Sequence, residues 1–174
     1  MTTSTYSKKI CLIGEFAVGK TSLIRRFVES RFDDAYISTI GVKVSRRQLT
    51  LPRENSSALM TLMVWDLAGG EKFDRVTQSY YQGAAGAILI CDLTRLETVD
   101  ALANYAHDFR TVNPNASLVV VGNKVDMEPQ RVVTDAKLGT VADRFGAPWF
   151  TASARSGANV ETLFATIGAL MLLP

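Results

Sequence analysis

The hydrophobic positions of the chain follow two alternating patterns. Short continuous apolar runs are typical of strands buried on both faces of a sheet, and apolar residues spaced three and four positions apart are typical of amphipathic helices. The predicted strands are residues 10–13, 42–51, 58–65, 84–91, 118–121 and 148–151. The predicted helices are residues 21–29, 98–110, 138–145 and 160–171.

Strands that alternate with helices predict an α/β fold with a mostly parallel sheet and helices on both faces. Residues 42–51 and 58–65 flank the turn 52–56, so they form a hairpin that gives the sheet one antiparallel edge strand. We expect residues 1–7 to be a flexible N-terminal tail and residues 8–174 to form one domain. In such sheets, ligands bind at the carboxyl ends of the strands.

Composition narrows the classes of function. The chain has 174 residues and a net charge of +2, which gives no electrostatic footprint for nucleic acid. No apolar stretch reaches the roughly 18 residues of a membrane span. Cys11 and Cys91 lie inside apolar runs, which indicates buried, reduced thiols and a cytoplasmic location. The sequence ends at Leu173-Pro174 without a lipidation motif, so contact with a membrane would be peripheral, through a partner or a missing tail.

A phosphate-binding loop directly follows the first predicted strand. Residues 14–21 read G-E-F-A-V-G-K-T and fit the pattern G-x-x-x-x-G-K-[ST]. Backbone N–H groups of such a loop surround a β-phosphate, Lys20 neutralises phosphate oxygens, and Thr21 offers its hydroxyl to Mg²⁺. The nucleotide-binding residues expected here are Glu15, Phe16, Ala17, Val18, Gly19, Lys20, Thr21 and Ser22.

A second metal ligand and a γ-phosphate contact are predicted after the strand 58–65. Asp66 ends this strand, and a carboxylate opposite a phosphate loop suits Mg²⁺, directly or through water. Gly69 follows three residues later and lets its backbone N–H approach the γ-phosphate closely.

The segment Asn123-Lys124-Val125-Asp126 is suited to read a guanine base. One carboxylate accepts both the N1–H and the N2–H₂ donors of guanine, whereas adenine would leave Asp126 unpaired, which is costly in a buried site. Asn123 would tie loops together, and the stem of Lys124 would lie over the base plane. The backbone N–H groups of Ser153, Ala154 and Arg155 would contact guanine O6.

These motifs, in this order and spacing, resemble the small GTPases of the Ras superfamily, and the Rab branch most closely, over about residues 8–172. The resemblance implies a P-loop NTPase G domain, with six strands, that binds GTP or GDP with Mg²⁺. Residues 36–42 resemble the first Rab switch. By this likeness Thr39 would bind Mg²⁺ and the γ-phosphate, Phe32 would lie edge-on against guanine, and Tyr36 could close over the phosphates. GTP would order the switches, and GDP would release them.

The same resemblance implies protein effectors and regulators. Their expected contact surface consists of Ile40, Gly41, Val42, Val44, Trp65 and Tyr80. Val44 stands where Rab proteins usually place a phenylalanine in an aromatic triad with Trp65 and Tyr80, so effector choice should differ from that of a typical Rab.

Two departures from the family concern catalysis. Gly70 stands where the family has a water-positioning glutamine, and Phe16 stands where it usually has a small residue. With Lys20, Thr39, Gly69 and Gly70 as the catalytic positions, we expect a switch that hydrolyses GTP slowly. One alternative is an interaction module that stays loaded with GTP. Another is a small-metabolite kinase, against which the guanine motif argues.

Four arginines remain outside these motifs. Arg25 and Arg26 on the first predicted helix, with Arg46 and Arg47 on the second strand, would form a solvated face or a small basic patch.

Overall fold

The computed structural model describes residues 3–35, 39–70 and 73–173. Six strands form one sheet in the order β2-β3-β1-β4-β5-β6, and only the β2–β3 pair is antiparallel. The predicted mostly parallel sheet with one antiparallel edge strand is therefore confirmed. The strands are β1 (Thr3–Ile13), β2 (Val42–Arg53), β3 (Ser56–Leu67), β4 (Gly86–Asp92), β5 (Ser117–Asn123) and β6 (Trp149–Thr151).

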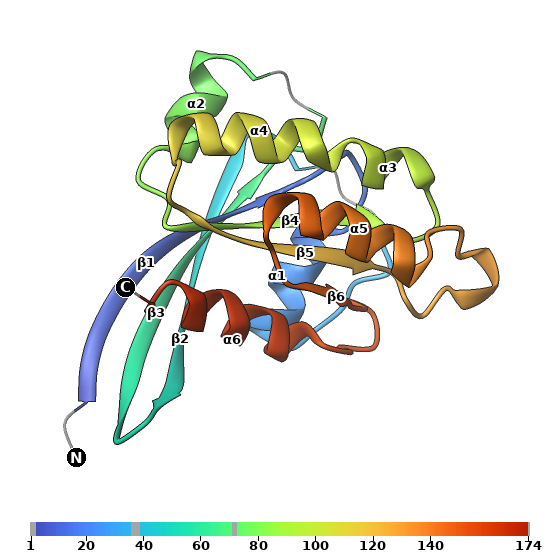
Figure 1. Ribbon diagram of the computed structural model, residues 1–174. Coiled ribbons are helices and arrows are strands. Elements are labelled where there is room, and N and C mark those ends of the chain that lie inside the picture. The colour runs from blue at the N-terminus through green and yellow to red at the C-terminus, as the bar shows by residue number, and fades with distance from the viewer. Residues whose placement is uncertain (1–2, 36–38, 71–72, 174) are drawn as a thin grey trace.

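Helices cover both faces of this sheet (Figure 1). The helices are α1 (Lys20–Glu29), α2 (Arg75–Tyr81), α3 (Leu96–Asp100), α4 (Leu102–Val112), α5 (Asp135–Phe145) and α6 (Val160–Leu170), with a short 3₁₀ helix, η1 (Glu128–Gln130). Side chains of α1 and α6 form one core cluster, in which the rings of Phe27 and Phe164 stack 3.8 Å apart. Side chains of α2 to α5 form the other, where Tyr81 meets Phe109 edge to face.

The continuous apolar runs are explained by burial on both sides. In β1, Ile10 and Leu12 pack toward α1 and α6, while Cys11 and Ile13 pack toward the opposite helical layer. Both cysteines of the chain are free and buried, as expected. This two-sided core fixes the strand ends, and therefore the loops that follow them, at one edge of the sheet.

The expectation of a flexible tail is wrong for residues 3–7. They form the first half of β1, where Thr3 to Ser7 pair in parallel with Ser57 to Thr61 of β3. The β2–β3 hairpin extends beyond the helical layers and offers β3 as a partner for this segment (Figure 1). The segment is polar and exposed, so its strand has no hydrophobic signature in the sequence.

The helical pattern also missed two features. The predicted helix 98–110 is two helices, α3 and α4, that meet at Ala101. Helix α2 was not predicted from periodicity, because its seven residues bury only Thr77 and Tyr81. Its beginning does have a local signal, since the Asp74 side chain accepts a hydrogen bond from the Thr77 N–H at 2.9 Å.

Candidate functional site

A cleft of about 280 Å³ lies at the carboxyl ends of the strands and brings most of the predicted site residues together. The predicted residues that line it are Phe16, Ala17, Gly19, Lys20, Thr21, Ser22, Phe32, Thr39, Gly69, Asn123, Lys124, Asp126, Ala154 and Arg155. The cleft is also lined by six residues that sequence reasoning did not select, namely Arg25, Asp33, Asp34, Ala35, Leu67 and Met127.

The remaining predicted residues that the structure describes lie next to the cleft or behind its lining. Asp66 and Ser153 are buried and form hydrogen bonds with lining residues. Val18 belongs to the core, and its carbonyl oxygen accepts a hydrogen bond from Asn123. Gly70 follows the lining residue Gly69. Tyr36 lies outside the described residues.

Two glycines of the phosphate loop lie so close to neighbouring residues that no side chain would fit at their positions. A Cβ atom on Gly14 would lie 2.2 Å from the Ile90 carbonyl oxygen, and one on Gly19 would lie 2.2 Å from the Asn123 amide nitrogen. The Lys20 ammonium donates to the carbonyl oxygens of Gly14 at 3.0 Å and Glu15 at 2.9 Å, so it spans the loop. Burial lowers the pKa of Lys20 to about 8, and nearby Asp66 and Glu15 oppose this shift. The loop therefore presents a buried cation to whatever anion enters the cleft.

Three oxygen-bearing side chains meet beside this lysine. The Thr21 hydroxyl lies 2.6 Å from Asp66 Oδ2, to which it donates, and 2.6 Å from the Thr39 hydroxyl. Asp66 Oδ1 is buried and has no hydrogen-bond partner within the described residues. Burial raises the pKa of Asp66, and the Thr21 hydrogen bond and the Lys20 charge oppose this rise. Hydroxyl and carboxylate oxygens are the ligands that Mg²⁺ prefers, so the donor set fits the predicted metal.

The base-reading motif is fixed by hydrogen bonds to two other loops. Asn123 donates to the Val18 carbonyl at 2.9 Å and accepts from the Ala154 N–H at 3.2 Å, which is the tying role predicted for it. Asp126 Oδ1 accepts from the Ser153 hydroxyl at 2.7 Å and faces the cleft. The Ala154 N–H that was expected to reach guanine O6 is therefore also engaged with Asn123.

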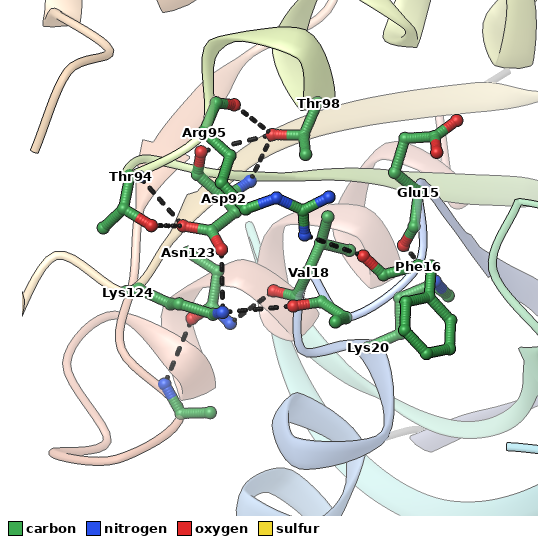
Figure 2. Close-up of polar contacts among 12 residues, drawn as sticks. Glu15, Phe16, Val18, Lys20, Asp92, Thr94, Arg95, Thr98, Asn123 and Lys124 are labelled. Atoms are coloured by element: carbon green, nitrogen blue, oxygen red, sulfur yellow. Dashed lines mark hydrogen bonds and ion pairs between the residues drawn. The ribbon is translucent and has the colours of Figure 1, made fainter. Parts of the chain in front are cut away.

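Asp92 at the end of β4 and Arg95 in the turn after it support the phosphate loop (Figure 2). Sequence reasoning missed both residues. Lys124 donates to the Ala17 carbonyl at 3.1 Å and pairs with buried Asp92 at 2.7 Å. Arg95 donates to the Phe16 carbonyl at 2.9 Å. Asp92 ends a continuous apolar strand, which is the signal that could have found it. No comparable sequence signal marks Arg95.

Gly69 and Gly70 lie against the phosphate loop. A Cβ on Gly69 would come within 2.6 Å of the Phe16 Cα, so only glycine allows this approach. Gly70 has a φ of +71°, and a Cβ there would lie 3.9 Å from the Phe16 Cβ. Next to them, the Tyr105 hydroxyl donates to the Glu15 carboxylate at 2.8 Å, and burial together with this carboxylate raises the pKa of Tyr105.

The sequence was compared with known protein families and characterised proteins. The model of the Ras family matches residues 9–172. The chain belongs to the Ras family. It is 38% identical over 160 residues to the Ras-related protein RABD2c of Arabidopsis thaliana, which covers 91% of this chain and 77% of that protein. It is 37% identical over 163 residues to RABD1 of the same plant, covering 93% of this chain and 78% of that protein.

This Ras-family chain is Rab-like, as predicted, and its relationship supports a small GTP-binding switch protein rather than a small-metabolite kinase. Members of the family bind GTP or GDP with Mg²⁺, which agrees with the donor set around Thr21. Within the described ranges, no helix combines the length and hydrophobicity that crossing a bilayer requires.

The residues expected to contact partners come from the segment after Thr39, from β2 and β3, and from α2. Ile40 is 93% exposed and Val44 is 45% exposed. The rings of Trp65 and Tyr80 lie 6.5 Å apart, and the Lys9 ammonium lies 3.7 Å above the Trp65 ring.

Three of the four arginines outside the motifs are engaged elsewhere, so the four share neither the solvated face nor the basic patch that the sequence suggested. Arg25 lines the cleft, and Arg26 donates to the Ala154 carbonyl at 2.8 Å. Arg47 lies over the Phe27 ring and pairs with Glu161 at 2.6 Å. Helical spacing alone could not show that α1 turns two of its arginines toward loops.

Proposed function

We propose that this Rab-like protein is a guanine-nucleotide switch that binds GTP or GDP with Mg²⁺ and hydrolyses GTP slowly. The observation that carries the slow step is the lack of a side chain at Gly70, which lies beside Phe16. At the position where a side chain would orient the attacking water there is only a hydrogen atom, and the space beside it is bordered by the Phe16 side chain. Positioning of the nucleophile and stabilisation of charge carry nearly all of phosphoryl-transfer catalysis, so the loss of the positioning group lowers the rate.

The phosphates would bind in the loop between β1 and α1. Lys20 would neutralise phosphate oxygens, and the Gly69 N–H would donate to the γ-phosphate, because Gly69 already touches the loop backbone. Thr21, Thr39 and Asp66 would hold Mg²⁺, with Asp66 bound directly or through water. When bound, Mg²⁺ would neutralise negative charge on the phosphates.

Recognition of guanine would rest on Asp126. Its carboxylate would accept the N1–H and N2–H₂ donors of the base, while the Ser153 hydroxyl holds it in place. Phe32 and the Lys124 stem would lie against the base, and the segment Ser153 to Arg155 would approach O6. Adenine offers no donor at N1 and would leave a desolvated carboxylate without a partner.

The switch would act through two segments that touch the phosphates. Thr39 leads directly into the exposed residue Ile40 and then β2, and Gly69 leads toward α2. Movement of either segment would change the proposed partner surface of Ile40, Gly41, Val42, Val44, Trp65 and Tyr80. If hydrolysis is negligible, the same surface would serve a module that remains in its GTP form.

Single-turnover hydrolysis tests the proposal. The protein is loaded with GTP labelled at the γ-phosphate, Mg²⁺ is added, and release of phosphate is followed. We expect a rate constant on the order of 10⁻⁴ s⁻¹ or below. Hydrogen exchange around Thr39 and Gly69 should be slower with a non-hydrolysable GTP analogue than with GDP. Complete hydrolysis within the first minutes would refute slow catalysis, and equal exchange in both states would refute the switch.

A further inference from the structure

One cleft residue, Arg25, has a donor that the described protein leaves unpaired. Its side chain lines the cleft and is 21% exposed. Arg25 Nε is buried and has no hydrogen-bond partner among the described residues. The nearest carboxylate oxygen, Asp33 Oδ2, is 3.9 Å from Nη1, which exceeds hydrogen-bond length. Arg25 therefore has hydrogen-bonding capacity that no described residue uses, on a partly exposed side chain that lines the cleft.

The neighbouring arginines show that this is particular to Arg25. Arg26 Nε donates to the Ala154 carbonyl at 2.8 Å, and Arg47 forms an ion pair with Glu161 at 2.6 Å. Both therefore have structural partners within the chain. Arg25 alone among these three lines the cleft, where a bound ligand could complete its contacts.

The place of Arg25 on α1 defines which part of a nucleotide it can reach. It lies three and four residues after Ser22 and Thr21, so all three face the same side of the helix. Phosphates bind at the N-terminus of this helix. Next to Arg25, the cleft is lined by Asp33, which follows Phe32, the residue expected to lie against the base. Arg25 therefore lies one helical turn after Thr21, on the part of the cleft that Asp33 also lines.

We propose that Arg25 is a further nucleotide-binding residue whose guanidinium pairs with the α-phosphate. This inference rests on the proposed guanine-nucleotide function. Lys20 and the metal site are assigned to the β- and γ-phosphates, which leaves the α-phosphate as the anion nearest to Ser22 and Arg25. A guanidinium carries several N–H donors and forms strong, directional hydrogen bonds with phosphate oxygens. Asp33 Oδ2 lies 3.9 Å from Arg25 Nη1 and would compete with the phosphate for the guanidinium.

The first test compares rates of GDP release. Arg25→Met keeps an unbranched apolar stem and removes the guanidinium with its charge, and Arg46→Met removes an exposed arginine of β2 as a matched control. We expect GDP to dissociate about tenfold faster or more from Arg25→Met, and within about twofold of the wild-type rate from Arg46→Met. Equal rates for the two variants would overturn the inference.

The second test uses Asp33→Asn, which removes the competing carboxylate. We expect this change to slow GDP release by about twofold to threefold in the wild-type background and to have no effect in Arg25→Met. The same effect in both backgrounds would overturn the inference. This arm also keeps the proposal testable if Arg25→Met does not fold, because Asp33→Asn alone must then slow release, and an unchanged or faster rate would refute it.

The third test distinguishes a contact of Arg25 with the α-phosphate from a contact with the ribose. With 2′,3′-dideoxy-GDP, the ratio of the Arg25→Met rate to the wild-type rate should be the same as with GDP. Loss of that ratio would assign Arg25 to the ribose hydroxyls and overturn the α-phosphate contact. If the wild-type protein binds no guanine nucleotide, the proposed function fails instead, so the two failures are distinguishable.

Discussion

Restoring a glutamine at position 70 should do little by itself. Gly70 has a φ of +71°, in the left-handed region that glycine adopts without strain. A Cβ built there lies 3.9 Å from the Phe16 Cβ and 4.0 Å from Glu15 Oε2. A glutamine would therefore start from a strained backbone, between a phenyl ring and a carboxylate.

The size of the effect follows from this geometry. The left-handed conformation costs a side-chain-bearing residue about 1–2 kcal/mol. That penalty corresponds to a factor of about 5–30 in the population that keeps the present backbone. The Phe16 side chain in van der Waals contact would also limit the rotamers open to a glutamine, which reduces the productive population further. We therefore expect Gly70→Gln to raise the hydrolysis rate constant only by about a few-fold. In-line positioning of the water would raise this rate constant far more in an unobstructed site.

Removing the Phe16 ring should allow a glutamine at position 70 to raise the hydrolysis rate further. The double variant Gly70→Gln, Phe16→Gly should exceed the product of the two single effects, because both positions border one space. The assay is single-turnover hydrolysis of preloaded GTP by wild type, both single variants and the double. Gly70→Ala serves as control, since it adds the backbone strain without the amide. Fast hydrolysis by the wild type would refute the premise, and strictly multiplicative effects would refute the shared space.

Three further changes test the site. Asp126→Asn should shift the preference from guanine toward xanthine nucleotides by about a hundredfold or more, because the C2 carbonyl of xanthine requires a donor; unchanged guanine preference in competition binding would contradict this. Thr21→Asn should raise the Mg²⁺ concentration needed for GTP binding by about tenfold or more, since it removes a proposed ligand, and an unchanged Mg²⁺ titration would count against that role. Burial lowers the pKa of Lys20 to about 8, and bound phosphates favour its charged form. Binding above this pH takes up a proton, so GDP affinity should fall about tenfold between about pH 7 and pH 9, and a flat pH profile by calorimetry would exclude this coupling.

Much of the site could be predicted because its motifs are contiguous and each follows a strand. The apolar runs before Gly14, Asp66 and Asn123 predict buried strands, and parallel strands bring their carboxyl ends to one edge. The side-chain chemistry of these short segments then indicates phosphate, metal and base contacts without knowledge of tertiary packing. The fold class follows from the same alternation of strands and helices.

The parts that could not be predicted depend on contacts between distant residues. Tyr105 and Glu15 are 90 residues apart in sequence but share a hydrogen bond. Arg25 looks like any other polar helix position until α1 is placed against the segment that contains Phe32 and Asp33. The first half of β1 is polar, so its pairing with β3 depends on the length of the hairpin and not on hydrophobicity.

The nucleotide carried by the purified protein tests the central claim most directly. The protein is purified in the presence of Mg²⁺ and denatured, and the released nucleotide is identified and quantified by ion-exchange chromatography. The account predicts GDP or GTP at close to one per chain. Adenine nucleotide at that level would contradict it.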